Sequence, residues 1–223
     1  MPEQLNFELP QRLAMGRSDF MIAPSNAVAL AMIDQTPNWA LHKLVLAGPS
    51  GSGKSHLAHV WAGDVGARII AAADLTEAQV PALAEDAVAV EDVQAIAENT
   101  PAQNALFHLH NMMFAEQNPL LLTGTGAPNL WRMSLPDLQS RIDAATVAML
   151  DSPDDALLAA LLAKHFDDRQ IKTPADLIPY LLLRMDRSFE AASDIVATLD
   201  RACLTQQRTL TRKFAAQVLD KTL

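Results

Sequence analysis

The stretch with the clearest capacity for chemistry is a glycine-rich loop at residues 48–55, which reads Gly-Pro-Ser-Gly-Ser-Gly-Lys-Ser. It fits the pattern G-x-x-x-x-G-K-[ST], in which glycines let consecutive backbone N–H groups turn inward around a phosphate chain. The alternative is a flexible Gly/Ser loop, but an apolar run precedes the stretch and a helical pattern follows it, so a helix N-terminus would face the same anion. The residues assigned to this nucleotide site are Gly48, Pro49, Ser50, Gly51, Ser52, Gly53, Lys54, Ser55 and His56.

Two of these side chains have specific expected roles. Lys54 would reach the β- and γ-phosphates, and the Ser55 hydroxyl would ligate Mg²⁺. Glu91 and Asp92 follow a third apolar run, and carboxylates at the carboxyl end of such a strand hold Mg²⁺ and orient water in phosphate-binding proteins. We therefore expect Ser55, Glu91 and Asp92 at the metal and Asp92 in catalysis; the alternative is ordinary solvation of a strand end.

The elements that must position these residues alternate between strand and helix. Apolar runs predict strands at 43–47, 67–71, 87–90, 120–123 and 146–150, with helices between them, which indicates a parallel sheet covered on both faces. Strand signals then stop, and helices are predicted at 154–167, 174–185, 189–204 and 212–219. The expected fold is α/β with a five-stranded parallel sheet and a small all-α domain. The expected divisions are a tail at 1–12, a nucleotide-binding domain at 13–151 and a helical domain at 152–223.

Composition narrows the class of protein. The 223-residue chain has a formal net charge of −9, and no basic patch resembles a DNA-binding module, so sequence-specific DNA binding is not expected. No apolar run approaches the length of a membrane span, and no export signal precedes the domain. With one cysteine, an internal disulfide is impossible. Together these features predict a cytoplasmic protein without a membrane partner.

The first ten residues form a separate pattern. Leu5, Phe7 and Leu9 alternate with polar residues between Pro2 and Pro10, which indicates an extended segment. Such a peptide either docks into a partner's groove or packs as an arm on its own domain, and composition alone favours the arm.

Several short stretches resemble the DnaA family of replication initiators, which are AAA+ proteins, and within it the Hda group that inactivates the initiator. The resemblance covers nearly the whole chain in the family's order. The stretches that carry it are Phe20-Met21-Ile22 with Ser25-Asn26, then residues 106–111 (Leu-Phe-His-Leu-His-Asn), 135–141 (Leu-Pro-Asp-Leu-Gln-Ser-Arg) and 199–202 (Leu-Asp-Arg-Ala).

The resemblance implies partners. The segment Gln4-Leu5-Asn6-Phe7-Glu8-Leu9 is similar to the Q-L-x-[LF] peptides that dock on the bacterial sliding clamp, which changes the preferred interpretation of the tail from arm to ligand. Gln4, Leu5, Phe7 and Leu9 would contact the clamp. Arg141 matches the family's arginine finger and would act in trans on ATP bound to DnaA, where a guanidinium offsets phosphoryl charge. The alternative for Arg141 is a surface salt bridge with Asp137 or Asp143.

This sequence departs from the family at hydrolytic positions. Glu91 replaces an Asp, Thr125 replaces an acidic sensor, and Glu190 falls where a sensing Arg is expected. Arg187 and Arg184 are the candidate substitutes, although neither occupies the matched position. We therefore expect bound ADP or ATP with Mg²⁺, weak or no intrinsic ATPase activity, and a regulatory role. Phe20 and Asn26 precede the sheet and are expected to frame the base. The alternative function is a self-contained P-loop kinase for a nucleotide or small molecule, and the sequence leaves homo-oligomerisation open.

Overall fold

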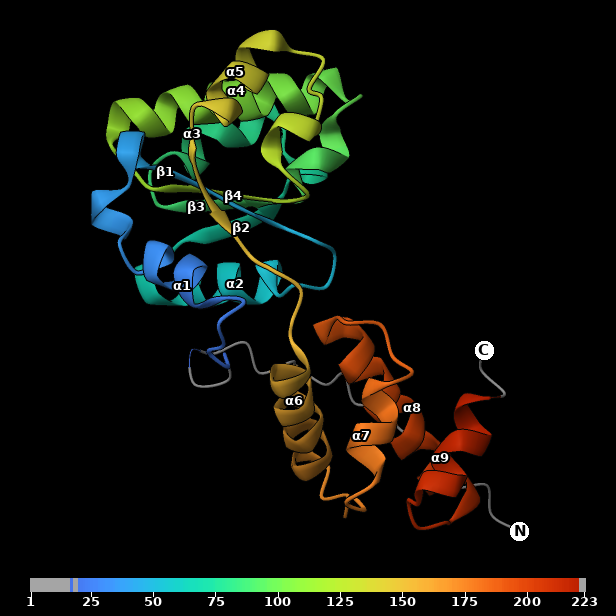
Figure 1. Ribbon diagram of the computed structural model, residues 1–223. Helices are drawn as coiled ribbons and strands as arrows, with labels where there is room; N and C mark the ends of the chain where they lie inside the picture. The colour runs from blue at the N-terminus through green and yellow to red at the C-terminus, as the bar shows by residue number, and fades with distance from the viewer. Residues whose placement is uncertain (1–16, 18–19, 221–223) are drawn as a thin grey trace.

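A computed structural model describes Arg17 and residues 20–220 of the chain. Its centre is one sheet of five parallel strands in the order β2-β3-β4-β1-β5, so β1 lies between β4 and the edge strand β5 (Figure 1). The predicted α/β class and strand number are confirmed. The strands are β1 (Lys43–Gly48), β2 (Arg68–Ala71), β3 (Val88–Glu91), β4 (Leu120–Thr125) and β5 (Thr146–Met149).

The central strands β1, β3 and β4 are buried on both faces of the sheet because they are apolar on both sides, whereas the outer strands β2 and β5 are only partly buried. Along β1, Val45 and Ala47 contribute to one core, whereas Leu44 and Leu46 contribute to the other. This is the pattern of a parallel sheet between two helical layers, where neither face meets water. Helices α1 and α2 cover one face, and α3, α4 and α5 cover the opposite face (Figure 1). The helices are α1 (Ala27–Ile33), α2 (Lys54–Val65), α3 (Val80–Leu83), α4 (Thr100–Glu116) and α5 (Pro136–Asp143).

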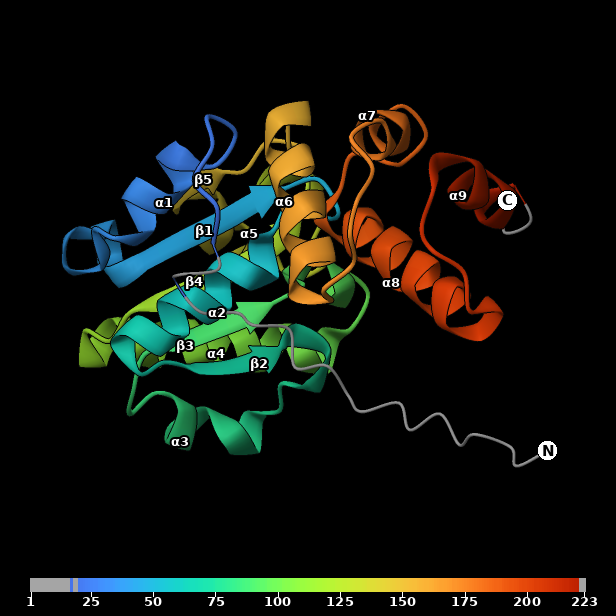
Figure 2. The same cartoon turned by 90° about the horizontal axis from the view of Figure 1, so that it is seen from below.

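Four further helices form a separate cluster beside the sheet, with a core of their own (Figures 1 and 2). Three of them begin at side-chain caps, in which Asp154, Ser188 and Thr211 accept hydrogen bonds from backbone N–H groups. The helix predicted over 174–185 is shorter than expected, because Pro179 lacks an N–H and is tolerated only near a helix start. The helices are α6 (Asp155–Asp168), α7 (Leu177–Leu182), α8 (Phe189–Gln206) and α9 (Arg212–Leu219).

The two ends of the sheet separate the candidate functional residues. The glycine-rich loop, Asp92 and Thr125 lie at or beyond the carboxyl ends of β1, β3 and β4, which a parallel sheet brings to one edge. The amino ends of β1 and β5 lie at the opposite edge, where α5 leads into β5. None of the described helices is long and apolar enough to cross a membrane.

Candidate functional site

The glycine-rich loop adopts backbone conformations that its glycines permit. Gly51 and Gly53 have φ values of +67° and +91°, a region that side chains with a Cβ rarely adopt. Gly53 is the N-cap residue of α2, so the first turn of that helix opens directly onto the loop. Gly48 packs so tightly that a Cβ there would lie 2.5 Å from the Leu150 carbonyl oxygen. The loop therefore has the form that the motif predicts.

Lys54 lies inside this loop. Its side chain is buried, and Nζ donates to the carbonyl oxygens of Pro49 at 2.7 Å and Gly48 at 3.2 Å. Burial lowers the pKa of Lys54, and the Asp92 carboxylate opposes that shift. The charges of the Lys54 ammonium and the Asp92 carboxylate therefore interact, as expected for the lysine and the strand-end carboxylate of a P-loop site.

Glu91 is the last residue of β3 and contains an unsatisfied oxygen. Among the described residues, Glu91 Oε1 and Ser52 Oγ are buried atoms without a hydrogen-bond partner. A buried carboxylate oxygen left unpaired in this way needs a donor or a cation. Ser55 is exposed on the first turn of α2, so the chain supplies a free hydroxyl as well. In the described ranges no three His, Cys, Asp or Glu side chains form a metal cluster.

Gln94, which sequence reasoning missed, contacts both Asp92 and the carboxyl end of β4. Asp92 has a φ of +55°, and its N–H donates to Thr123 Oγ1 at 3.3 Å. Gln94 Nε2 approaches Asp92 Oδ1 at 3.4 Å, while Gln94 Oε1 accepts from the Thr125 N–H at 3.0 Å. Gln94 thus fixes the two strand ends at the same site. Its position two residues after the predicted carboxylate is the only sequence signal for this role.

Phe20 and His56 lie together at the start of α2. Their ring centroids are 5.4 Å apart in an edge-to-face arrangement. Asn26 is buried, and both ends of its amide bind neighbouring backbone: Nδ2 donates to Met21 O at 2.8 Å and Oδ1 accepts from Ala23 N at 2.9 Å. Asn26 therefore shapes the loop after Phe20, and any part it plays in framing a base acts through that loop.

The helical domain contacts the loop through residues that sequence analysis did not single out. The Phe189 N–H donates to Gly51 O at 2.9 Å, and a Cβ on Gly51 would meet Ser188 Cβ at 2.3 Å. Glu190 follows on the exposed first turn of α8. Arg187, the substitute sensor, forms an exposed salt bridge with Asp155 at 3.0 Å. The start of α8 is thus part of the site.

Arg141 lies far from this site. It is exposed on α5, and its carbonyl oxygen accepts from Lys43 Nζ, on the first residue of β1, at 2.7 Å. Because β1 rises about 3.3 Å per residue, its two ends are roughly 16 Å apart, and the loop follows the far end. The predicted salt bridge with Asp137 or Asp143 is not among the ion pairs of the described residues. Asp143 instead accepts from Gln139 Nε2 at 2.8 Å.

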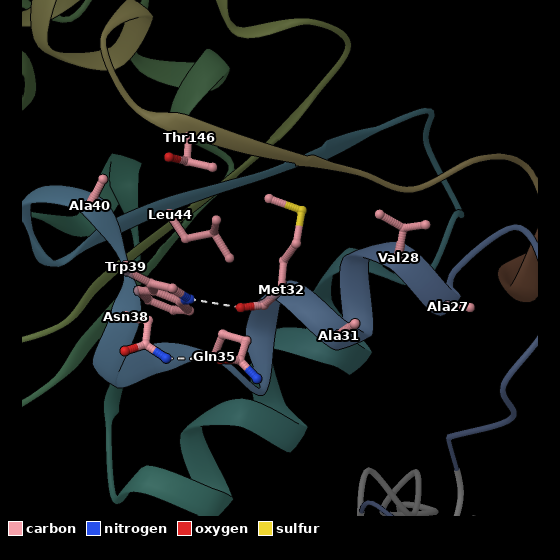
Figure 3. A pocket seen from close by; sticks show the side chains of 10 residues that line it. All are labelled: Ala27, Val28, Ala31, Met32, Gln35, Asn38, Trp39, Ala40, Leu44 and Thr146. Carbon is pink, nitrogen blue, oxygen red and sulfur yellow. Dashed lines mark hydrogen bonds between the residues drawn. The ribbon is translucent and has the colours of Figure 1, made fainter.

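The peptide predicted to bind the clamp, with Gln4, Leu5, Phe7 and Leu9, lies outside the described residues. An apolar pocket of about 610 Å³ lies elsewhere, between α1 and the starts of β1 and β5 (Figure 3). Trp39 lines it and donates from Nε1 to Met32 O at 2.8 Å. The pocket shares no lining residue with the glycine-rich loop.

One family model matches the helical domain, and several solved structures of DnaA are similar to the whole fold. Residues 154–219 match the family model described as Hda, lid domain. The structure is similar to domain III of the Thermotoga maritima replication initiation protein DnaA, with a TM-score of 0.78 and 18% identity over 93% of this chain and 96% of that one. It is also similar to DnaA from Aquifex aeolicus bound to AMPPCP (TM-score 0.68, 17% identity, 91% of this chain and 71% of that one). A replication initiator DnaA bound to AMPPCP and single-stranded DNA gives a TM-score of 0.69 at 18% identity, over 91% and 70% of the two chains.

Proposed function

Because the chain is a DnaA-related AAA+ protein with a lid of the Hda type, we propose that it is a nucleotide-bound negative regulator of replication initiation. In this proposal the tail docks on the sliding clamp in the cytoplasm, and the domain meets ATP-bound DnaA. Arg141 then enters the nucleotide site of DnaA and stimulates hydrolysis. The chain's own nucleotide is structural.

The observation that carries the proposal is the placement of Arg141. Arg141 is exposed, its side chain forms no ion pair within the described region, and its backbone carbonyl lies at the opposite end of β1 from the chain's own phosphate loop. A separation of roughly 16 Å exceeds the reach of an arginine side chain, which supports action on a partner's nucleotide rather than its own. Arginine suits this role because its planar fork matches phosphate oxygens.

We propose that the chain itself binds ADP or ATP with Mg²⁺. Two of the similar DnaA structures contain AMPPCP, and the loop around Lys54 has the corresponding form. The unpaired Glu91 Oε1 and the exposed Ser55 hydroxyl are oxygen donors of the kind that Mg²⁺ takes, and Asp92 follows Glu91 directly in the chain. Mg²⁺ there would neutralise phosphate charge. Glu91, Thr125 and Glu190 depart from the hydrolytic pattern, so we infer that the chain's own turnover is slow.

A kinase remains the alternative from a different class, but nothing specific favours it. A kinase needs an acceptor site beside the γ-phosphate. The 610 Å³ pocket lies along α1 and the amino ends of β1 and β5, away from the phosphate loop.

The test is hydrolysis of ATP bound to DnaA, measured with clamp and DNA present, with and without this protein. Stimulation that also requires residues 1–10 is the expected result. Stimulation without any need for the tail would remove clamp docking from the proposal, and no stimulation by the intact chain would refute the regulatory function.

A further inference from the structure

Lys43 is a buried cation at the start of β1, only 2% exposed. Its Nζ is held by two groups, His110 Nε2 at 2.8 Å and the Arg141 carbonyl oxygen at 2.7 Å. Burying an ammonium costs stability unless a carboxylate compensates it, and no carboxylate of the described chain pairs with Lys43. The fold therefore retains a costly charge beneath the candidate finger.

His110 is suited to accept this hydrogen bond. It comes from α4, is 7% exposed, and burial together with the Lys43 charge lowers its pKa to about 4. Its ring is consequently neutral near pH 7, so Nε2 offers a lone pair to the ammonium. The other described hydrogen bond of Lys43 Nζ is to the backbone carbonyl oxygen of Arg141 on α5. Lys43 thus links β1, α4 and α5 at one point.

This link acts on Arg141 in two ways. The hydrogen bond fixes its carbonyl and so the point from which the side chain leaves α5. The two positive charges also repel one another: burial, and after it the Arg141 guanidinium, lowers the pKa of Lys43 to about 8. Repulsion from this fixed buried charge favours conformations in which the guanidinium points away from the domain.

The nearest carboxylates do not capture the side chain. Gln139 Nε2 donates to Asp143 Oδ1 at 2.8 Å, and the side-chain oxygen Oε1 of Gln139 accepts from Met133 N at 2.9 Å. Asp143 therefore already accepts a hydrogen bond from a side chain that is itself held in place. Asp137, one turn before Arg141, forms no ion pair with it in the described structure.

We propose that Lys43 is a positioning residue for Arg141: it holds the Arg141 peptide and repels its guanidinium, so that the guanidinium stays extended and unpaired for the phosphates of a partner's nucleotide. The inference rests on the proposed function for the identity of that partner. The link itself is a property of this chain and is measurable without any partner.

The first measurement uses the isolated wild-type protein. The backbone carbonyl ¹³C resonance of Arg141 should titrate with an apparent midpoint near pH 8, because the ammonium that it accepts from loses its proton there. The same resonance should show no such step in Lys43→Met, which keeps a long apolar chain. A step of equal size and midpoint in wild type and Lys43→Met, or identical Arg141 carbonyl shifts in the two proteins at pH 7, overturns the proposal without reference to DnaA.

The second measurement is stimulated hydrolysis of DnaA-bound ATP. Lys43→Met should reduce stimulation at least about tenfold, as expected when a reacting group is displaced, with nucleotide and clamp binding unchanged. Lys213→Met, which makes the same change on the exposed face of α9, should stimulate as wild type does. Equal stimulation by Lys43→Met and wild type would overturn the positioning role. Failure of the wild type itself would refute the proposed function, and the carbonyl titration would still decide whether Lys43 controls the Arg141 peptide.

Discussion

The buried charge of Lys43 should make the free energy of unfolding depend on pH, and the substitution Lys43→Met should remove this contribution. Burial, with the Arg141 charge nearby, lowers the pKa of Lys43 from 10.5 to about 8. Below pH 8 the amine is charged in both the folded and the unfolded chain. Between pH 8 and 10.5 the unfolded chain binds the proton more strongly, so the free energy of unfolding contributed by Lys43 rises with pH.

The expected size follows from the two pKa values. At 1.36 kcal/mol per pKa unit, the interval between 8 and 10.5 corresponds to roughly 3 kcal/mol, of which about 2 kcal/mol should be gained by pH 9.5. Lys43→Met lacks the titrating group, so wild type should gain about 2 kcal/mol relative to it between pH 7 and 9.5. Near pH 7 the variant should be no less stable than wild type, because relief of the buried charge offsets two lost hydrogen bonds.

Urea unfolding of wild type, Lys43→Met and the surface control Lys213→Met, at several pH values from 7 to 9.5, measures this difference. Comparing variants at each pH removes the contribution of other titrating groups. Parallel curves for wild type and Lys43→Met would show that Lys43 is not desolvated as its buried position at the start of β1 implies.

Three further outcomes are expected. Lys54→Ala should weaken ADP or ATP binding at least about tenfold by calorimetry, because it removes a charge-assisted phosphate contact, and unchanged affinity would count against the loop as the site. Gly51→Ala should lower the free energy of unfolding by about 1 kcal/mol or more, because φ at Gly51 is positive and Ser188 of the helical domain leaves no space for a Cβ. Gly63→Ala, at an open position in α2, should instead raise the free energy of unfolding by up to about 1 kcal/mol. Equal effects of the two substitutions would reject the contact between the helical domain and the glycine-rich loop. Replacing Leu5 and Phe7 with Ala should cost roughly 1–3 kcal/mol of clamp affinity each, and normal clamp binding by the double variant would leave the tail without a docking role.

The central strands of the sheet were predictable from sequence because they are almost entirely buried. A parallel strand that meets no water on either face has a continuous apolar sequence, as 44–47 and 120–122 do, so the existence of these strands follows from their residue types. The glycine-rich loop was equally readable, because positive φ values at Gly51 and Gly53 require glycine. The ends of the elements were less accurate. Glu91 belongs to β3 rather than following it, and Leu150 lies beyond β5, which ends at Met149.

What the sequence did not reveal depends on contacts between distant segments. Lys43 reads as the polar start of a strand, and its burial depends on His110 and the Arg141 peptide, 67 and 98 residues away. The contact of Ser188 with Gly51 depends on how the helical domain packs against the glycine-rich loop. Local sequence patterns do not predict such contacts, because the residues that meet are far apart in the sequence and the segments around them carry no signal of the contact.

The most direct test of the central claim is the rate at which DnaA hydrolyses its ATP when clamp, DNA and variants of Arg141 are present. Arg141→Ala and Arg141→Lys should both fold, bind nucleotide and bind clamp, since the side chain is exposed and contacts no described partner. Both should lose stimulation on the order of 10³-fold, or down to the unstimulated rate, because an ammonium does not reproduce the fork of a guanidinium. Full stimulation by Arg141→Ala would contradict the account, and loss of the chain's own nucleotide in that variant would show that Arg141 acts in cis.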